Sequence, residues 1–139
     1  MADYNVTVAN IRFSESAQLE VGIAADELAK GQAVVKDSNG RWTHADAAET
    51  DAEERTRYGV TASPTPAAGQ PVLVCVKDTN YTPGFTMAVT EAVYVSGNAG
   101  GEWMPQADLA SGNAIVPCMV PFSTTQAVFD PQPTGKVVP

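Results

Sequence analysis

Residues 32–44 read Gln-Ala-Val-Val-Lys-Asp-Ser-Asn-Gly-Arg-Trp-Thr-His. Two short runs, 32–36 and 41–44, flank the tetrapeptide Asp-Ser-Asn-Gly at 37–40. An Asn-Gly pair between such runs is among the strongest short signals for a β-hairpin, because both residues tolerate positive φ. We therefore predict two antiparallel strands joined by this turn.

Similar short runs continue outward from this hairpin. Apolar and polar residues alternate from Tyr4 to Phe13, as expected of a half-buried strand or an extended arm. A short helical turn is predicted over 24–30, ending at Gly31. Further strands are predicted at 19–23, from Val60, and at 70–76, 85–89, 92–95, 102–104 and 115–122. Turn signals recur about every ten residues, which favours a sandwich or a small barrel.

Composition supports the same fold class. Of 139 residues, 17% are charged, and 11 are glycine and 10 proline, which is typical of a turn-rich β protein and excludes a helical bundle. We predict a mostly β fold: a compact small β-barrel or sandwich of short antiparallel strands and hairpins, with at most one or two short helices and extended terminal arms. The expected organisation is an N-terminal arm or edge strand at 1–12, a single β domain at 13–122 and a Pro-rich C-terminal arm at 123–139.

Two segments allow more than one interpretation. Residues 45–57 carry five carboxylates within nine residues and have Thr50 and Glu53 at capping-box spacing, so they form either one short solvated helix or an acidic loop. The tail after Asp130 has three prolines in nine residues, so it cannot join a central strand. It is either a disordered end or an arm that orders on a neighbouring subunit.

Two segments of the chain have weakly similar sequences, which we call the internal echo. Residues 28–42, followed by Ala45-Asp46, resemble residues 87–103, followed by Ala107-Asp108. The offset is 59 residues at the front (87 − 28) and 61 at the tryptophans (103 − 42). Either each half contains the same hairpin closed by Trp42 or Trp103, or two Ala/Val/Gly-rich hairpins are alike by chance.

The charge balance argues against several partners. The formal net charge is −8, which repels nucleic acid and anionic membranes. No apolar run approaches the roughly 20 residues of a membrane span, and the first residues do not resemble a signal peptide, so synthesis in the cytoplasm is expected. Cys75 and Cys118 each lie in an apolar run and are predicted to be buried free thiols, with a disulfide as the alternative.

No catalytic or cofactor-binding pattern is visible. His44 is the one histidine, and no Cys, His or carboxylate lies at ligand spacing from it, so a structural role is expected. Neither cysteine has an activating partner, and no glycine run matches a phosphate-binding loop. The acidic segment lacks a calcium-loop pattern and reads as a solvated face. We therefore predict no enzyme activity, no cofactor and no metal site.

Four stretches in order carry a resemblance: Leu28-Ala-Lys-Gly-Gln-Ala-Val-Val closing on Trp42, Ala45-Asp-Ala, Arg57-Tyr-Gly-Val, and Ala67-Ala-Gly-Gln-Pro-Val-Leu-Val-Cys-Val. Over residues 20–76 this order resembles the capsid cement, or head decoration, proteins of tailed bacteriophages. The family implies a structural virion protein that binds the outer surface of an icosahedral capsid and stabilises the expanded shell by bridging coat subunits. The implied partner is the major capsid protein, and homotrimers are common.

The resemblance also suggests contact residues. Family members commonly touch the shell with a terminal arm, which makes the N-terminal segment the expected capsid contact: Ala2, Asp3, Tyr4, Asn5, Val6, Thr7 and Val8. Added as an edge strand, this segment would gain main-chain hydrogen bonds to a capsid sheet. Apolar residues outside the domain's own core would form the trimer interface, with Tyr81, Phe85 and Tyr94 as candidates.

A different class of function fits the same fold. A carbohydrate- or receptor-binding β module of a phage tail fibre or surface appendage could use Trp42 and Trp103 as stacking platforms for sugar rings. In the competing interpretation both tryptophans cover the ends of the core. Their exposure distinguishes the two interpretations.

Overall fold

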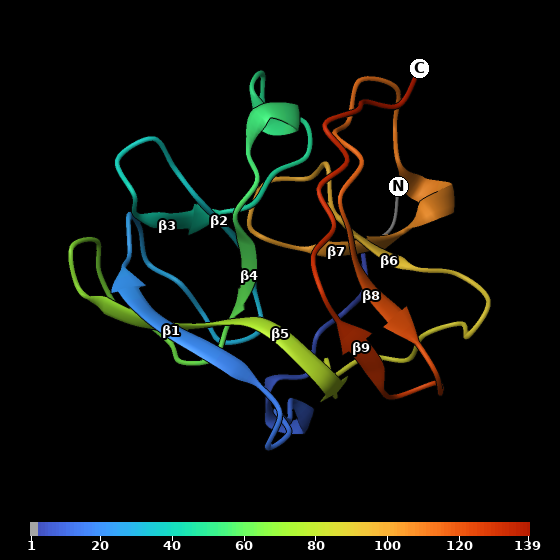
Figure 1. The fold of residues 1–139 in the computed structure, drawn as a ribbon, viewed down its shortest axis with the longest axis horizontal. Helices are drawn as coiled ribbons and strands as arrows, with labels where there is room; N and C mark the ends of the chain where they lie inside the picture. The colour runs from blue at the N-terminus through green and yellow to red at the C-terminus, as the bar shows by residue number, and fades with distance from the viewer. Residues whose placement is uncertain (1–2) are drawn as a thin grey trace.

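A computed structural model describes residues 3–139, and it is mostly β, with no helix of seven residues or more (Figure 1). The predicted fold class is therefore confirmed. The strands are β1 (Gln18–Ile23), β2 (Ala33–Lys36), β3 (Trp42–His44), β4 (Tyr58–Thr61), β5 (Pro71–Tyr81), β6 (Val93–Val95), β7 (Trp103–Pro105), β8 (Pro117–Pro121) and β9 (Ala127–Phe129). Three short 3-10 turns accompany them: η1 (Val8–Asn10), η2 (Ala52–Glu54) and η3 (Gln106–Asp108).

The strands form one curled antiparallel sheet with the order β3-β2-β4-β5-β9-β8-β6-β7, and β1 pairs with β5. The sheet has two parts, one with strands β1 to β4 and the other with strands β6 to β9, and strand β5 pairs with strands of both. Its first half pairs with β1 and β4, and its second half pairs with β9 through Asp78 opposite Phe129 and Tyr81 opposite Ala127. Figure 1 shows β5 running from the part that holds β1 to β4 toward the part that holds β6 to β9.

The two parts repeat one arrangement. From each end toward the β5–β9 junction, a hairpin is followed by a third and a fourth strand, as β3-β2-β4-β5 and as β7-β6-β8-β9. The hairpins share their register: Lys36 pairs with Trp42, and Val95 pairs with Trp103. Lys36 corresponds to Val95 at an offset of 59 residues, and Trp42 corresponds to Trp103 at an offset of 61, the two offsets seen in the sequence. The internal echo therefore corresponds to a repeated structural unit.

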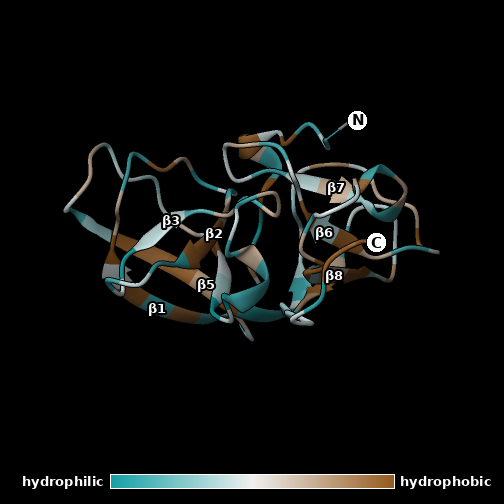
Figure 2. Cartoon of the chain, turned by 90° about the horizontal axis from the view of Figure 1, so that it is seen from above, coloured by the Kyte–Doolittle hydropathy of each residue, from teal (hydrophilic) through white to brown (hydrophobic). Residues whose placement is uncertain are grey.

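The first part curls into a half-barrel with its own small core. Its open side is bridged at one point, where Ala24 pairs with Trp42 and the Ala25 N–H donates to the Trp42 carbonyl over 2.7 Å. Trp42 fills the interior with Val34 and Val72. A larger cluster lies between the two parts and includes Val35, and hydrophobic residues lie along β1, β2, β5 and β8 (Figure 2). Adjacent residues of β2 thus enter different cores, so this strand is buried on both faces.

The Asn39-Gly40 hairpin is confirmed, with one refinement of the turn. Only Gly40 adopts positive φ, at 76°, while the Asp37 carboxylate accepts hydrogen bonds from the backbone N–H groups of Asn39 and Arg41. Both free cysteines are buried, so the prediction of two thiols is also confirmed. Burial raises the pKa of Cys75 to about 12 and that of Cys118 further above its usual range.

Several local predictions are wrong because long-range hydrogen bonds replace local ones. Residues 24–30 form no helical turn, since the Ala24 and Leu28 N–H groups donate to carbonyls of Gln70 and Thr65. Residues 85–89 form no strand, and β5 continues five residues beyond the predicted end at residue 76. Strand β9 was not predicted. Of the two alternatives for residues 4–13, the strand is wrong, because this segment holds the η1 turn and no regular strand.

The acidic segment is a loop with one 3-10 turn. Its carboxylates remain near the surface, where Arg55 bridges Glu49 and Asp51 over 3.2 and 3.4 Å. The Tyr58 hydroxyl donates to the Ala52 carbonyl and fastens the loop to β4. The loop alternative is thus the correct one.

The C-terminal residues lie along their own chain. Val137 pairs with Ala114, and the N–H groups of Asp130 and Gln132 donate to the carbonyls of Cys118 and Pro117. The tail is therefore neither a disordered end nor a free arm in this structure. Proline prevents it from becoming a regular strand, but the remaining N–H groups still find partners.

Candidate functional site

The N-terminal segment, the predicted capsid contact, lies on the second part of the sheet. The Tyr4 N–H donates to the Trp103 carbonyl over 2.9 Å, and the Thr7 N–H donates to the Gly84 carbonyl over 2.8 Å. Asn5, Thr7 and Val8 are exposed, whereas Asp3, Tyr4 and Val6 are half-buried. Ala2 lies outside the described residues. A contact with a capsid through this segment stays a prediction, and an added sheet would have to use N–H groups other than those of Tyr4 and Thr7.

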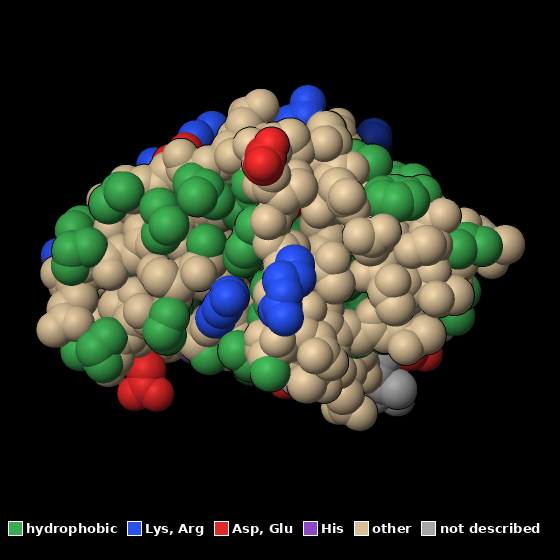
Figure 3. Space-filling view, turned by 90° about the horizontal axis from the view of Figure 1, so that it is seen from below, with side chains coloured by type: hydrophobic (Ala, Val, Ile, Leu, Met, Phe, Trp, Pro, Cys, Tyr) green, Lys and Arg blue, Asp and Glu red, His purple; other side chains and the backbone are tan. Residues whose placement is uncertain are grey.

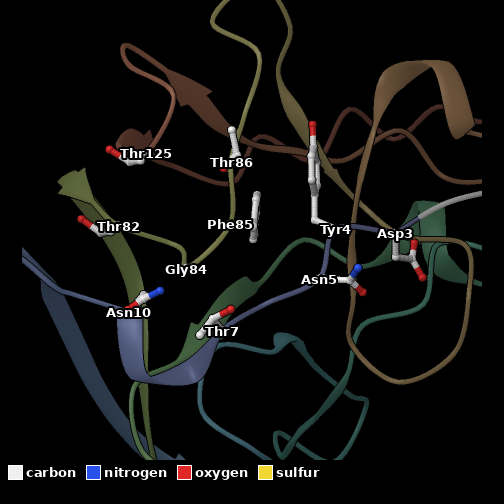
Figure 4. Close-up of a pocket in the computed structure, with 10 residues that line it drawn as sticks. All are labelled: Asp3, Tyr4, Asn5, Thr7, Asn10, Thr82, Gly84, Phe85, Thr86 and Thr125. Atoms are coloured by element: carbon white, nitrogen blue, oxygen red, sulfur yellow. The ribbon is translucent and has the colours of Figure 1, made fainter.

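Tyr4, a predicted capsid contact, lies against Phe85, a predicted residue of the subunit interface. The rings of Tyr4 and Phe85 stack with centroids 4.4 Å apart and planes 8° from parallel. They line an open surface cleft of about 580 Å³ that also includes Asn10, Thr82, Thr86 and Thr125 (Figure 4). The sequence did not indicate these four polar residues, because they come from separate loops and strand ends with no common spacing.

Asp3 forms the charged edge of this cleft. Its carboxylate accepts hydrogen bonds from the Ser96 hydroxyl at 2.6 Å and from the Asn98 side-chain amide at 2.9 Å. Burial raises the pKa of Asp3, but hydrogen bonds from Glu102, Ser96 and Asn98 outweigh burial and hold it below its ordinary value. The hydrogen bond to Asp3 raises the pKa of Glu102 to about 7. Protonation of Glu102 is therefore favoured below about pH 7, while Asp3 stays ionised.

Tyr81, predicted as a residue of the subunit interface, is a core residue of the chain and is not accessible on its surface. Its side chain is fully buried and packs between Phe13 and Phe129, with ring centroids 5.0 and 5.6 Å away. The physical reason is that β5 extends to residue 81 and turns this side chain into the core. Burial raises the pKa of the Tyr81 hydroxyl far above its usual range.

Tyr94 lies in a different place from Phe85. It is half-buried and lines a separate pocket of about 260 Å³ together with Leu109, Ile115 and Pro139. The three predicted interface tyrosine and phenylalanine residues therefore do not form one surface. Phe85 and Tyr94 remain accessible, and their role between subunits stays a prediction.

An apolar surface lies on the outer side of β1. Leu19, Val21 and Ile23 are exposed at 47%, 74% and 39%, while the residues between them, Glu20 and Gly22, are half-buried. Val21 and Ile23 lie opposite Leu73 and Pro71 of β5, and directly opposed residues share a face. Hydrophobic side chains gather on this side of the molecule (Figure 3). We call Leu19, Val21, Ile23, Leu73 and Pro71 the β1 face; their alternation was visible in the sequence, but not which side faces solvent.

Both tryptophans are buried, Trp42 completely and Trp103 at 1% exposure. The Trp103 Nε1–H donates to the Gly31 carbonyl over 3.0 Å. Neither ring offers a face to a sugar, so the tryptophans are core residues. A role as stacking platforms is excluded for them by this burial.

The remaining candidates for chemistry are accounted for by contacts within the chain. His44 Nε2 lies 3.0 Å from the Gln32 side-chain oxygen, and its Nδ1 lies 3.8 Å from an Asp26 oxygen. Within residues 3–139, no three His, Cys, Asp or Glu side chains are grouped to hold a metal ion. In the same range, no helix is long and apolar enough to cross a membrane.

No protein-family model, curated protein or solved structure matches this chain. Functional inference therefore depends on the surfaces and clefts of the chain itself.

Proposed function

We propose that this chain is a structural virion protein that binds the outer surface of an icosahedral phage capsid and stabilises the expanded shell by bridging coat subunits. The β1 face is the observation that carries the proposal. Val21 is 74% exposed on a strand beside exposed Leu19 and Ile23, on a protein that has two well-filled cores. A contiguous apolar surface of this kind is typical of a protein interaction site.

The proposed partner surface belongs to the major capsid protein. Burial of three aliphatic side chains contributes a few kcal/mol at roughly 25 cal/mol per Å². One such contact is weak, but many identical copies on one lattice, each touching more than one coat subunit, convert weak contacts into strong clamping. The net charge of −8 keeps the free protein soluble at high concentration.

Two finer features belong to the same proposal. A homotrimer would bring three β1 faces to neighbouring coat subunits, with Phe85 and Tyr94 as the accessible candidates for contacts between copies. The N-terminal segment is a second candidate contact with the shell. The protein would be made in the host cytoplasm and would have no enzyme activity.

The alternative, a receptor-binding module of a tail fibre, is distinguished by stoichiometry. Mass spectrometry of intact virions should find this chain at a ratio to the major coat protein near one, or at a fixed fraction of one. A handful of copies per particle would favour the tail, and absence from the virion would overturn the proposal.

Substitutions then test the surface. Val21→Asp places a charge on the β1 face and should abolish binding to expanded shells, as measured by co-sedimentation. Val120→Asp is the matched control, because Val120 is 63% exposed on β8 and lies outside the β1 face. It should bind normally, with both variants folded by circular dichroism.

The outcomes separate the two candidate contacts. Normal binding by Val21→Asp would overturn the assignment of the β1 face, and equal loss in both variants would do the same. A deletion of residues 2–8 that abolishes binding while Val21→Asp still binds would move the contact to the N-terminal segment. Sedimentation velocity tests the trimer, and a monomer that stays monomeric on the shell would exclude it.

A further inference from the structure

The cleft beside Phe85 combines one open aromatic face with several uncharged polar side chains, and Asp3 lies at its edge. We call it the Phe85 cleft and define it by Tyr4, Asn10, Thr82, Phe85, Thr86 and Thr125. We propose that the Phe85 cleft binds a neutral sugar ring, such as a hexose or N-acetylhexosamine unit of a glycan. This inference does not depend on where the protein is located in a virion.

The stacking of Tyr4 leaves one face of the Phe85 ring available. The two rings are nearly parallel at 4.4 Å, so Tyr4 covers one face. Figure 4 shows Asn10, Thr82 and Thr125 on the other side of Phe85 from Tyr4. The apolar C–H face of a pyranose can pack on such a ring, which supplies area at little cost in side-chain entropy.

The polar groups around this ring are free to bind a ligand. Within residues 3–139, the side chains of Asn10, Thr82, Thr86 and Thr125 make no hydrogen bond to another residue. Three hydroxyls and one amide provide both donors and acceptors. A sugar ring presents hydroxyl groups around its rim, and these match groups that donate and accept.

The cleft is preformed by backbone contacts. Thr7 donates to the Gly84 carbonyl, and Arg12 and Thr82 exchange two backbone hydrogen bonds of 3.0 and 2.9 Å. Gly84 has φ of +85°, and a Cβ there would lie 2.6 Å from the Thr7 carbonyl oxygen. Only a glycine at position 84 therefore allows this segment to lie so close to the Thr7 carbonyl group at the floor of the cleft. Preorganisation reduces the entropy that binding must offset.

The charges of the lining residues favour a neutral sugar over an anionic one. Among the residues described in the structure, no Lys, Arg or His lines the cleft, and the one charged lining residue, Asp3 at its edge, already accepts hydrogen bonds from Ser96 and Asn98. An anionic sugar or a phosphate would find no Lys, Arg or His side chain among the described lining residues and would meet a protein of net charge −8. The volume of about 580 Å³ falls within the range of small-molecule sites.

A proline-rich peptide is the competing occupant. Such peptides also stack on aromatic side chains, but their sites are grooves lined by several open rings. Here Tyr4 and Phe85 cover each other, and polar side chains, those of Asn10, Thr82 and Thr125, line the cleft on the side away from Tyr4 (Figure 4). The balance of groups therefore favours a sugar.

Nuclear magnetic resonance on the full chain tests the proposal. A panel of neutral hexoses, N-acetylhexosamines and pentoses is titrated to about 50 mM against ¹⁵N-labelled protein, with a Pro-rich decapeptide as the comparison ligand. We expect at least one sugar to shift amides of residues 7–10 and 82–86, with a Kd of about 1 mM. Saturation transfer from aromatic protons should reach one C–H face of that sugar.

Variants assign the site. Phe85→Ala should weaken binding at least about tenfold, which corresponds to about 1.4 kcal/mol. Because Phe85 is half-buried, Asn10→Ala and Thr125→Val provide exposed substitutions that preserve packing, and each should weaken binding by about threefold. Phe122→Ala, at an aromatic residue 53% exposed outside the cleft, is the control and should bind as the parent does.

Three results would overturn the proposal. These are no shift with any sugar of the panel, shifts that map away from the Phe85 cleft, and binding by the peptide but not by sugars. Equal weakening by Phe122→Ala and Phe85→Ala would also contradict the assigned site.

Discussion

The indole ring of Trp42 occupies the space that a side chain at Gly22 would need. A Cβ at position 22 would lie 2.6 Å from both Cδ1 and Nε1 of Trp42. Gly22 lies on β1 opposite Val72, and its lack of a side chain allows Trp42 to cross the interior of the half-barrel from β3. The packing of Trp42 in this core therefore depends on the absence of a side chain at Gly22.

Gly22→Ala should destabilise the protein by about 2 kcal/mol, because the added methyl group overpacks a filled interior. Urea unfolding followed by tryptophan fluorescence measures the change. In a Trp42→Phe background the smaller ring leaves more room, and the same substitution should cost less than half as much. Equal costs in the two backgrounds would show that Gly22 and Trp42 are not coupled.

Tyr81→Phe should raise the free energy of unfolding by about 1 kcal/mol. Within residues 3–139, the buried Tyr81 hydroxyl has no hydrogen-bond partner, so its removal relieves an uncompensated desolvation cost. Tyr58→Phe is the matched control, since that hydroxyl donates to the Ala52 carbonyl at 3.1 Å. The control should lose about 1 kcal/mol by the same urea assay. Destabilisation by both substitutions would mean that Tyr81 has a partner.

Stability should fall as the pH rises through neutrality. The folded state raises the pKa of Glu102 from 4.5 to about 7, so its contribution is complete below pH 4.5 and is lost as the pH rises through about 7. Glu102→Gln still donates to Asp3 but does not titrate, so it should remove this slope between pH 5 and 8. The effect should be small, because Glu102 is exposed and screened.

Carboxyl ¹³C chemical shifts check the same assignment directly. Glu102 should titrate near pH 7, whereas Asp3 should titrate below its ordinary pKa, where hydrogen bonds from Glu102, Ser96 and Asn98 outweigh the effect of burial. An ordinary titration of Glu102 near pH 4.5 would contradict the raised pKa of this carboxyl group.

The two thiols should be unreactive in the native protein at pH 8 and both reactive after denaturation. Burial raises the pKa of Cys75 to about 12 and that of Cys118 even further, so almost no thiolate is present. Titration with a chromogenic disulfide reagent, with and without guanidinium, counts the thiols. Rapid reaction of the native protein would contradict their burial, and none after denaturation would indicate a disulfide.

Local sequence was sufficient for features that depend on neighbouring residues. The Asn39-Gly40 turn predicts its hairpin because glycine reaches positive φ without strain, and the apolar runs around Cys75 and Cys118 predict buried strands. The similarity between residues 28–42 and 87–103 left a repeated hairpin and a chance likeness open, and the pairing of Lys36 with Trp42 and of Val95 with Trp103 agrees with the repeated hairpin.

Tertiary structure decided what depends on distant partners. The sequence did not show that β5 continues to Tyr81, because the ladder that extends it is supplied by β9, some 50 residues later in the chain. For the same reason Tyr81 changed from a candidate contact into a core residue, and Phe85 met Tyr4 in one cleft. Local propensity is a weak prior on strand ends, since backbone groups bond to whichever partner the fold brings near.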